Sequence, residues 1–234
     1  MQDISDQPGG TITSRITRIL ADRIVAGALP PGERLRQDHI AAEFGTSHVP
    51  VREAFRRLEA RGLVISEPRR GVRVAGLDPL AVREVTGMRA ALESLALRHA
   101  IPQMTPDILA AAGQALQDGE ASADIAVWEA ANRRFHRTLL APCRMPRLLS
   151  AIDDLHAASS RFLLATWQSA DWQPRSDSEH AAILAAAGSG AADRAAGLLA
   201  DHILAAGEAL IAMLERRTGG GGGGGGRETD TTDT

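Results

Sequence analysis

Apolar positions in the first third of the chain predict three short helices followed by two short strands. Between residues 11 and 62 they recur every three or four positions in three runs, which is the spacing of helices with one buried face. The pattern then changes to extended runs at 63–66 and 72–74, on either side of the turn Arg69-Arg70-Gly71. The second and third helices are joined by Gly45-Thr46-Ser47. This order predicts a helix-turn-helix with a wing, whose last helix fits the major groove of DNA.

From residue 79 onward the apolar spacing is helical, and no strand pattern interrupts it. Prolines mark the breaks, so the predicted helices cover 79–100, 105–118, 123–141, 146–170, 177–188 and 190–217. We predict a mainly α fold, with an N-terminal winged helix-turn-helix followed by an all-α helical bundle. Its expected parts are a flexible N-terminus (1–10), a DNA-binding domain (11–76), a linker (77–79), an effector-binding and dimerisation domain (80–217) and a disordered glycine-rich tail (218–234).

Composition narrows the classes of function. The chain contains no lysine, which excludes Schiff-base and pyridoxal-phosphate chemistry. A single cysteine, Cys143, excludes an internal disulfide. The N-terminus lacks the pattern of a signal peptide and no run of 18 apolar residues is present, so we expect a cytoplasmic protein without a membrane partner.

The charge is divided unevenly along the chain. Residues 1–76 carry 12 arginines against 9 acidic residues, and residues 77–234 carry 14 against 20. A basic first part followed by an acidic second part is typical of DNA contact followed by a regulatory body.

The third predicted helix, Ser47 to Arg61, carries the residue types that read DNA. Ser47 is placed to cap it, and Arg52 and Arg56 lie four apart on a face other than the apolar one. Arginine pairs bidentately with guanine or with phosphate. The alternative is an exposed face whose arginines pair with Glu53 and Glu59. The predicted DNA contacts are Ser47, His48 and Arg52 to bases, Arg56 to base or phosphate, Arg36 to phosphate, and Arg69 and Arg70 to the minor groove.

Four polar residues of the helical half form a candidate metal site. Asn132 and His136 share one helix face, while His180 and His202 fall on two later helices. Three imidazoles and one amide oxygen facing a bundle core suit a divalent transition metal, with positions left for water or a carboxylate. An isolated histidine is more often an ordinary core or surface residue, so both interpretations stay open. We predict that His39, His48, His99 and His156 are not ligands, with His156 the strongest exception.

The stretch LPPGERLRQDHIAAEFGTSHVPVREAFRRLEARGLV and the wing RRGVRV resemble the winged-helix domain of the GntR family of bacterial transcription regulators. The resemblance covers residues 11–75 and implies a DNA-binding regulator, more often a repressor. His48 departs from the arginine common in the family. A neutral imidazole is a weaker partner for phosphate or guanine, so operator preference is expected to differ and binding to strengthen as the pH falls.

The stretches MRAALESLALRHA, NRRFHRTLLAP and SEHAAILAAAGSGAADRAAGLLADHI resemble the FCD ligand-binding domain of the FadR subfamily. The resemblance implies a metal held by Asn132, His136, His180 and His202, often zinc, with nickel and manganese as alternatives. It also implies a small carboxylate effector near Arg89, for which the alternative is an ion pair with Glu93. A homodimer that binds a palindromic double-stranded DNA operator is implied as well. The family frequently has Asp at the position of Asn132, which lacks that negative charge.

Two other functions compete with a metal-gated regulator. The first is a DNA-binding regulator whose helical half is a metal-free dimerisation module. The second is a metal-dependent hydrolase with Glu179 as its base, although neighbouring positions on a helix face different directions, which places Glu179 poorly beside His180. The DNA-binding half has no role in an enzyme, so we predict no enzymatic activity.

Overall fold

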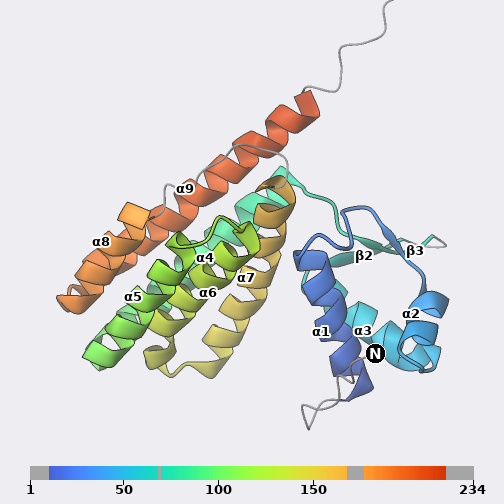
Figure 1. The fold of residues 1–234 in the computed structure, drawn as a ribbon, viewed down its shortest axis with the longest axis horizontal. Coiled ribbons are helices and arrows are strands. Elements are labelled where there is room, and N and C mark those ends of the chain that lie inside the picture. Colours follow the sequence, from blue (N-terminus) through green and yellow to red (C-terminus); the bar gives the residue numbers. More distant parts are fainter. Residues whose placement is uncertain (1–10, 68–69, 168–176, 220–234) are drawn as a thin grey trace, which may run out of the picture.

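A three-stranded antiparallel sheet and three helices form the first part of the molecule. The computed structural model describes residues 11–67, 70–167 and 177–219 (Figure 1). The strand order is β1-β3-β2, with Arg34 opposite Arg73 and Val64 opposite Val74. The elements are α1 (Ile12–Val25), β1 (Arg34–Leu35), α2 (Gln37–Glu43), α3 (His48–Ala60), β2 (Val64–Glu67) and β3 (Gly71–Val74).

The periodicity of α3 explains how it is held. Val51, Ala54, Phe55 and Leu58 are buried in one core with residues of α1, α2 and the sheet, and the opposite face of α3 is exposed. The helix ends before Gly62, whose φ of 65° is a conformation that favours glycine. The predicted winged helix-turn-helix is therefore confirmed. The two-residue strand β1 was not predicted, because Leu29-Pro30-Pro31-Gly32 reads as a turn that leads directly into the next helix.

The remaining described residues form an all-α bundle, as predicted. Asp78, Thr105 and Asp124 each accept a hydrogen bond at a helix N-terminus from a backbone N–H two or three residues later. Two short 3-10 turns were not predicted. The elements are α4 (Pro79–Ala100), η1 (Ile101–Gln103), α5 (Pro106–Glu120), α6 (Ile125–Leu140), η2 (Ala141–Cys143), α7 (Pro146–Trp167), α8 (Asp177–Gly188) and α9 (Ala192–Gly219).

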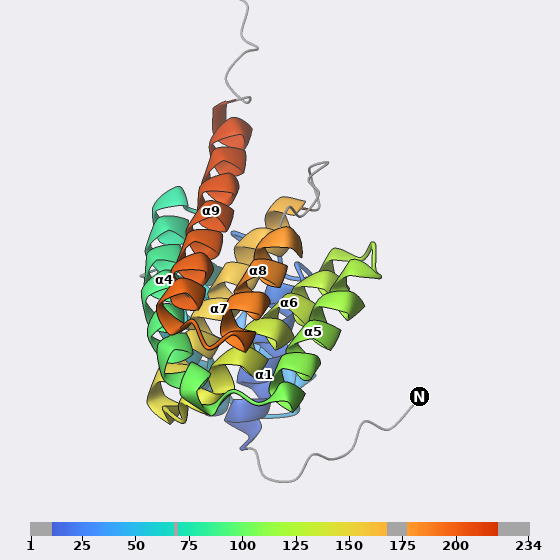
Figure 2. The same ribbon diagram turned by 90° about the vertical axis from the view of Figure 1, so that its left-hand side faces the viewer.

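The bundle core gathers residues from nearly all of these helices. Leu97, Phe135, Ile183 and Leu199 are fully or almost fully buried in it. Helix α9 runs along α4, while α5, α6, α7 and α8 lie beside them (Figure 2). The arrangement turns one face of α4, α6, α7, α8 and α9 toward a common interior, and polar side chains from these helices meet there.

Helix α7 joins the two parts of the molecule. It packs against α1. Its Asp154 forms an ion pair with Arg61 at the end of α3, with 3.0 Å between Oδ1 and Nε. The buried Arg161 donates from Nη1 to the backbone carbonyl of Ala75, directly after β3, at 2.6 Å. The recognition helix and the end of the wing are thus both attached to the same helix of the bundle.

Over Ala192–Arg216, α9 is long and apolar enough to cross a membrane by length and composition. The sequence predicted no membrane span because no run of 18 apolar residues is uninterrupted, and charged residues do interrupt this stretch. In the structure, α9 packs against α4 and α8 and contributes Leu199 and Ile203 to the bundle core.

Gly207 sets the closest approach of α9 to α4. A Cβ placed there would lie 2.4 Å from Cγ2 and 2.5 Å from Oγ1 of Thr86, whereas a Cβ at Gly197 of the same helix meets nothing within 4 Å. We expect Gly207→Ala to destabilise the protein by roughly 1–3 kcal/mol through overpacking. Gly197→Ala should stabilise it by about 0.5–1 kcal/mol, because alanine loses less backbone entropy in a helix. Urea unfolding of both variants measures the difference. Equal changes in the free energy of unfolding for the two variants would show that α4 and α9 can move apart at Gly207 without cost.

Candidate functional site

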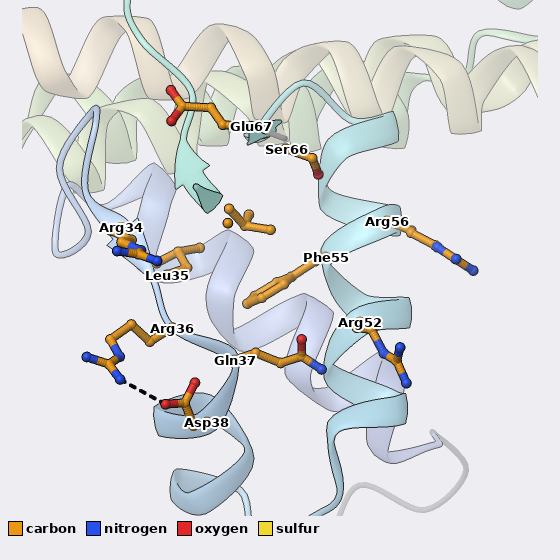
Figure 3. Close-up of a pocket in the computed structure, with 12 residues that line it drawn as sticks. Arg34, Leu35, Arg36, Gln37, Asp38, Arg52, Phe55, Arg56, Ser66 and Glu67 are labelled. Carbon is orange, nitrogen blue, oxygen red and sulfur yellow. Dashed lines mark hydrogen bonds and ion pairs between the residues drawn. The ribbon is translucent and has the colours of Figure 1, made fainter. Parts of the chain in front are cut away.

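The exposed side of α3 faces a groove of about 700 Å³ between this helix, β1 and the wing. Phe55 points inward toward Leu35, while Arg52 and Arg56 extend away from the helix (Figure 3). Among the described residues, Arg52 has no hydrogen-bond or ion-pair partner. Arg56 lies 3.8 Å from Glu53, and its side chain is 79% exposed. Both arginines are therefore available to an anionic partner. Of the two, only Arg56 forms the ion pair that the alternative interpretation expected, and its distance to Glu53 is long.

The start of α3 differs in one detail from the prediction. Ser47 occupies the N-cap position, but its side chain makes no capping hydrogen bond. A different hydrogen bond joins α2 to α3 at this point, in which Nε2 of Gln37 donates to the carbonyl oxygen of His48 at 2.8 Å. The exposed hydroxyl of Ser47 and the exposed ring of His48 consequently face solvent.

The other predicted DNA contacts lie around the same groove. Arg36 lines it from the start of α2 and pairs with Asp38 at 3.0 Å. Arg70 is exposed in the wing turn, and Arg69 lies outside the described residues. The sequence analysis missed Arg34, which lines the groove from β1 with its guanidinium beside Gly71. The exposed–buried alternation of Arg34 and Leu35 was the signal for it.

The three predicted histidine ligands meet inside the bundle. His136 comes from α6, His180 from α8 and His202 from α9, and all three are buried. One ligand atom from each lies within 4.8 Å of the others. The ring centroids of His180 and His202 are 4.4 Å apart, and each lies 5.8 Å from that of His136. This convergence is what a metal ion held by several helices requires.

Hydrogen bonds orient two of these rings. The Nδ1 atom of His136 is 2.7 Å from Oε2 of Glu93, and Nδ1 of His202 is 2.7 Å from Oε2 of Glu179. Because a carboxylate only accepts, each ring donates its Nδ1–H, which leaves the Nε2 lone pair for a metal. Sequence reasoning considered Glu93 only as a partner of Arg89 and missed its contact with His136. It also considered Glu179 only as a poorly placed base, whereas this residue contacts His202 rather than His180.

The atoms that would ligate a metal lack other partners. Oδ1 of Asn132, Nε2 of His136 and Nε2 of His180 are buried and have no hydrogen-bond partner in the part of the chain that the structure describes. The amide of Asn132 donates from Nδ2 to Oε2 of Glu129 at 3.2 Å, so its oxygen is the free end. Buried polar atoms are nearly always satisfied, and three unsatisfied atoms on predicted ligands fit a bound cation.

Burial keeps the histidines in the neutral form that binds metals. It lowers the pKa of His180 to about 2 and that of His202 to about 4, and the neighbouring imidazoles act in the same direction. The pKa of His136 is also lowered by burial, although Glu93 opposes the shift. Burial raises the pKa of Glu93, but the charge of Arg89 and the interactions with His156 and His136 outweigh it and hold that pKa well below its ordinary value.

A second polar group lies beside the histidines. Arg89 donates from Nε to Oε1 of Glu93 at 2.8 Å and from Nη1 to Oγ of Ser159 at 3.0 Å. His156 lies 3.2 Å from the same carboxylate oxygen. Glu93, His136 and His156 are also close enough together to hold a metal. However, the guanidinium of Arg89 already occupies Glu93 and repels a cation there, so the set with Asn132 fits a metal better.

A cavity of about 300 Å³ opens beside these ligands. Arg89, Asn132, His136 and His202 line it, together with Thr86 and Gly207 at the crossing of α4 and α9. The predicted pairing of Arg89 with Glu93 and its predicted place at the cavity are both present. A small molecule in this space would contact Arg89 and the metal-facing side of the histidines together.

Family comparisons agree with both halves of the structure. Residues 12–74 match the bacterial regulatory proteins of the GntR family, and residues 84–205, more than half of the chain, match the FCD domain. The chain therefore belongs to the GntR family of DNA-binding transcriptional regulators, in the group that carries an FCD domain.

Individual relatives are regulators rather than enzymes. The chain is 35% identical over 143 residues to a protein of Paenarthrobacter nicotinovorans named "Probable D-xylose utilization operon transcriptional repressor", covering 60% of this chain and 63% of that protein. It is 28% identical over 177 residues to the Nta operon transcriptional regulator of Aminobacter aminovorans, covering 74% and 82% of the two chains. The match therefore spans less than two thirds of the first relative and more of the second.

Solved structures share the same architecture. A GntR family member from Pseudomonas syringae pv. tomato superposes with a TM-score of 0.59 at 31% identity, covering 92% of this chain and 91% of that one. The McbR/YncC protein of E. coli superposes with a TM-score of 0.74 at 22% identity, covering 89% and 100%. The second likeness concerns the fold alone.

The lowered histidine pKa values predict how stability depends on pH. In the unfolded chain these histidines titrate near pH 6.5, whereas His180 and His202 titrate near 2 and 4 when folded. The unfolded state therefore binds more protons below pH 6.5, and stability falls as the pH drops. For metal-stripped protein we expect a loss of about 2 kcal/mol per buried histidine between pH 7.5 and 5.

Denaturant unfolding at the two pH values tests this, with His180→Asn as the comparison. The variant should lose less stability than the unsubstituted protein over the same interval. An identical loss in both would mean that His180 takes up a proton in the folded state.

Proposed function

We propose that this protein is a repressor whose affinity for its operator is controlled by a small carboxylate bound at a metal site in the helical half. The observation that carries the proposal is the convergence of His136, His180 and His202. Two of these histidines line a cavity together with Asn132 and Arg89. The ligand atoms of Asn132, His136 and His180 lack any partner among the described residues. Glu179, the residue that a hydrolase would use as its base, is bonded to His202, which weighs against hydrolysis.

Asn132, His136, His180 and His202 would hold a divalent metal, zinc in the first place and nickel or manganese as alternatives. Imidazole nitrogens suit each of these ions. Four protein ligands leave room for a further oxygen, and the bound metal would attract a carboxylate there. Glu93 and Glu179 fix the two rings to which they bond, so the lone pairs are directed before the metal arrives.

Binding to DNA would use the exposed side of α3 and the wing. Ser47, His48 and Arg52 lie on the first two turns of the helix, where side chains reach base edges. Arg56 would contact a base or phosphate and Arg36 a phosphate, while Arg69 and Arg70 would enter the adjacent minor groove. The free guanidinium of Arg52 among the described residues supports its role as the principal reader.

A homodimer would match this arrangement to a palindromic operator. Exposed apolar side chains on α4 support an interface with a second copy: Leu80 is 70% exposed, Met88 46% and Leu95 40%. A repressor of this kind acts in the cytoplasm, where its operator and its metabolite are found.

Helix α7 offers the route by which a ligand would change DNA binding. Its His156 and Ser159 contact Glu93 and Arg89 at the cavity, while Asp154 and Arg161 on the same helix hold Arg61 and Ala75 of the winged helix. A ligand that draws Arg89 toward itself would change the position of α7. The ligand needs only to bind one arrangement of α7 and the winged helix more tightly than another. A coupling free energy of ~1–3 kcal/mol between the two sites changes operator affinity roughly 5- to 150-fold.

Arg52→Ala tests the DNA-reading surface. We expect specific operator binding to weaken roughly 5- to 150-fold, because a bidentate base contact contributes about 1–3 kcal/mol. The matched control is Arg57→Ala, which removes the same charge from a residue that pairs with Glu53 and Ser14. Fluorescence anisotropy with a selected operator and with random duplex measures specificity. Specific binding that survives in the Arg52 variant would place the reading face elsewhere.

His136→Ala tests the metal site. Losing one ligand should reduce zinc affinity on the order of 100-fold or more, since even losing an outer hydrogen bond to a ligand costs 10- to 100-fold. Binding to DNA at low salt should be unchanged. The control is His99→Ala, an exposed histidine of α4. Zinc per protomer after dialysis is the first readout, and the thermal shift produced by small carboxylates with and without EDTA is the second.

Two results would decide against this function. Unchanged zinc content in the His136 variant would mean that these residues are not ligands. Melting temperatures that respond to neither EDTA nor any acid would favour the alternative of a metal-free dimerisation module.

A further inference from the structure

Glu129 is a buried carboxylate in the cavity that the metal site does not use as a ligand. It lies on α6, one turn before Asn132, is 6% exposed and lines the cavity. Among the residues that the structure describes, no arginine or histidine lies within ion-pair distance of it. Charged side chains are almost never buried without a partner that compensates them. Its two polar neighbours are uncharged.

Those neighbours use only part of its hydrogen-bonding capacity. Asn132 donates from Nδ2 to Oε2 at 3.2 Å, and the hydroxyl of Ser160 donates to Oε1. An ionised carboxylate offers about four acceptor positions. About two acceptor positions therefore remain on a group that borders the cavity.

The same contact explains how the amide of Asn132 is oriented. Glu129 accepts from the NH₂ end of the amide, and the amide oxygen is left without a partner among the described residues. An aspartate at position 132 would place two carboxylates in contact, where they repel each other. Next to Asn132 the carboxylate is therefore that of Glu129, which lines the cavity and is not itself a proposed ligand.

The cationic group of the cavity is already engaged. Arg89 bonds to Glu93 and to Ser159, so its positive charge is already paired with a carboxylate of the protein. A second carboxylate on the ligand would meet Glu129 without a free cation to balance it. A hydroxyl or ammonium group would instead supply the donor that Glu129 lacks.

We infer that Glu129 determines which carboxylate the protein senses. The effector is a monocarboxylic acid with a hydrogen-bond donor on its chain, either a hydroxyl or an ammonium group, and neither a plain alkanoate nor a dicarboxylate. This inference rests on the proposed function, in which the metal takes the carboxylate of the effector. Glu129, which lines the same cavity next to Asn132, then binds the donor group on the chain of the effector.

The test uses the zinc-loaded full chain and two sets of acids with matched carbon chains. The three-carbon set is propionate, lactate, alanine and malonate; the six-carbon set is hexanoate, gluconate, norleucine and adipate. Isothermal titration gives each affinity. In at least one set, the hydroxy or amino acid should bind about tenfold or more tightly than both the alkanoate and the diacid, as a charge-assisted hydrogen bond provides. Which of the two binds identifies the donor.

Glu129→Gln should reduce that ratio to near one, since the neutral amide no longer attracts the donor or repels a second carboxylate. Glu120→Gln, an exposed residue of α5, is the control for the loss of one charge. Zinc content is measured for each variant, so that a displaced Asn132 is detected separately from a lost donor contact.

Three results would overturn the inference. If an alkanoate or diacid binds in a zinc-dependent way as tightly as its matched acid, Glu129 does not select the effector, while the proposed function stands. The same follows if the Gln variant keeps its zinc and an unchanged ratio. Binding of no acid in either set to the zinc-loaded protein would overturn both the inference and the proposed function.

Discussion

The buried carboxylate of Glu93 is the interaction on which the interior of the bundle depends. It is fully buried on α4 and contacts Arg89 of its own helix, His136 of α6 and His156 of α7. An isolated carboxylate at this depth would be protonated or displaced. The guanidinium and the two rings compensate it and hold its pKa well below the ordinary value. One charge thereby fixes the relative positions of three helices.

The same charge determines what His136 can do. By accepting the Nδ1 proton, Glu93 selects one tautomer and directs the Nε2 lone pair into the space shared with His180 and His202. Neither ring identity nor helix position alone would achieve this. Removal of Glu93 would leave Arg89 as a buried cation without its ion-pair partner, and such losses are strongly destabilising. The bundle and the metal-facing geometry therefore share one structural cause.

Helix α7 connects this interior to the DNA-reading half. His156 and Arg161 are both buried on it, five residues apart, with one contacting Glu93 and the other the carbonyl of Ala75. Burial lowers the pKa of Arg161 to about 10, and its Nε–H has no partner among the described residues. A buried cation with an unsatisfied donor makes the attachment to Ala75 costly to maintain. A displacement of α7 would therefore be felt at the end of the wing.

Much of this arrangement follows from the sequence because its signals are local. Prolines and polar caps such as Asp78 and Asp124 set helix ends to within a few residues, and the apolar face of α3 identified its buried side. The convergence of His136, His180 and His202 came from family resemblance, since no periodicity says which helices face each other. The contact of Glu93 with His136, the role of Glu129 and the strand β1 were missed because they exist only through partners far along the chain. Spacing alone could not reveal that Glu179 reaches His202.

The charges around the cavity give a physical reason for a divalent ion. Glu93, Glu129 and Glu179 are formally negative and Arg89 is formally positive, while burial keeps the histidines neutral. This group therefore carries a formal excess of two negative charges before any ion binds. A divalent cation on the histidine side cancels that excess, and an incoming carboxylate restores part of it. Electrostatic interactions between these groups are strong because the surroundings have a low dielectric constant. A bound metal would repel the guanidinium of Arg89 and a bound acid would attract it, so the two would favour different positions of Arg89 and hence of α7.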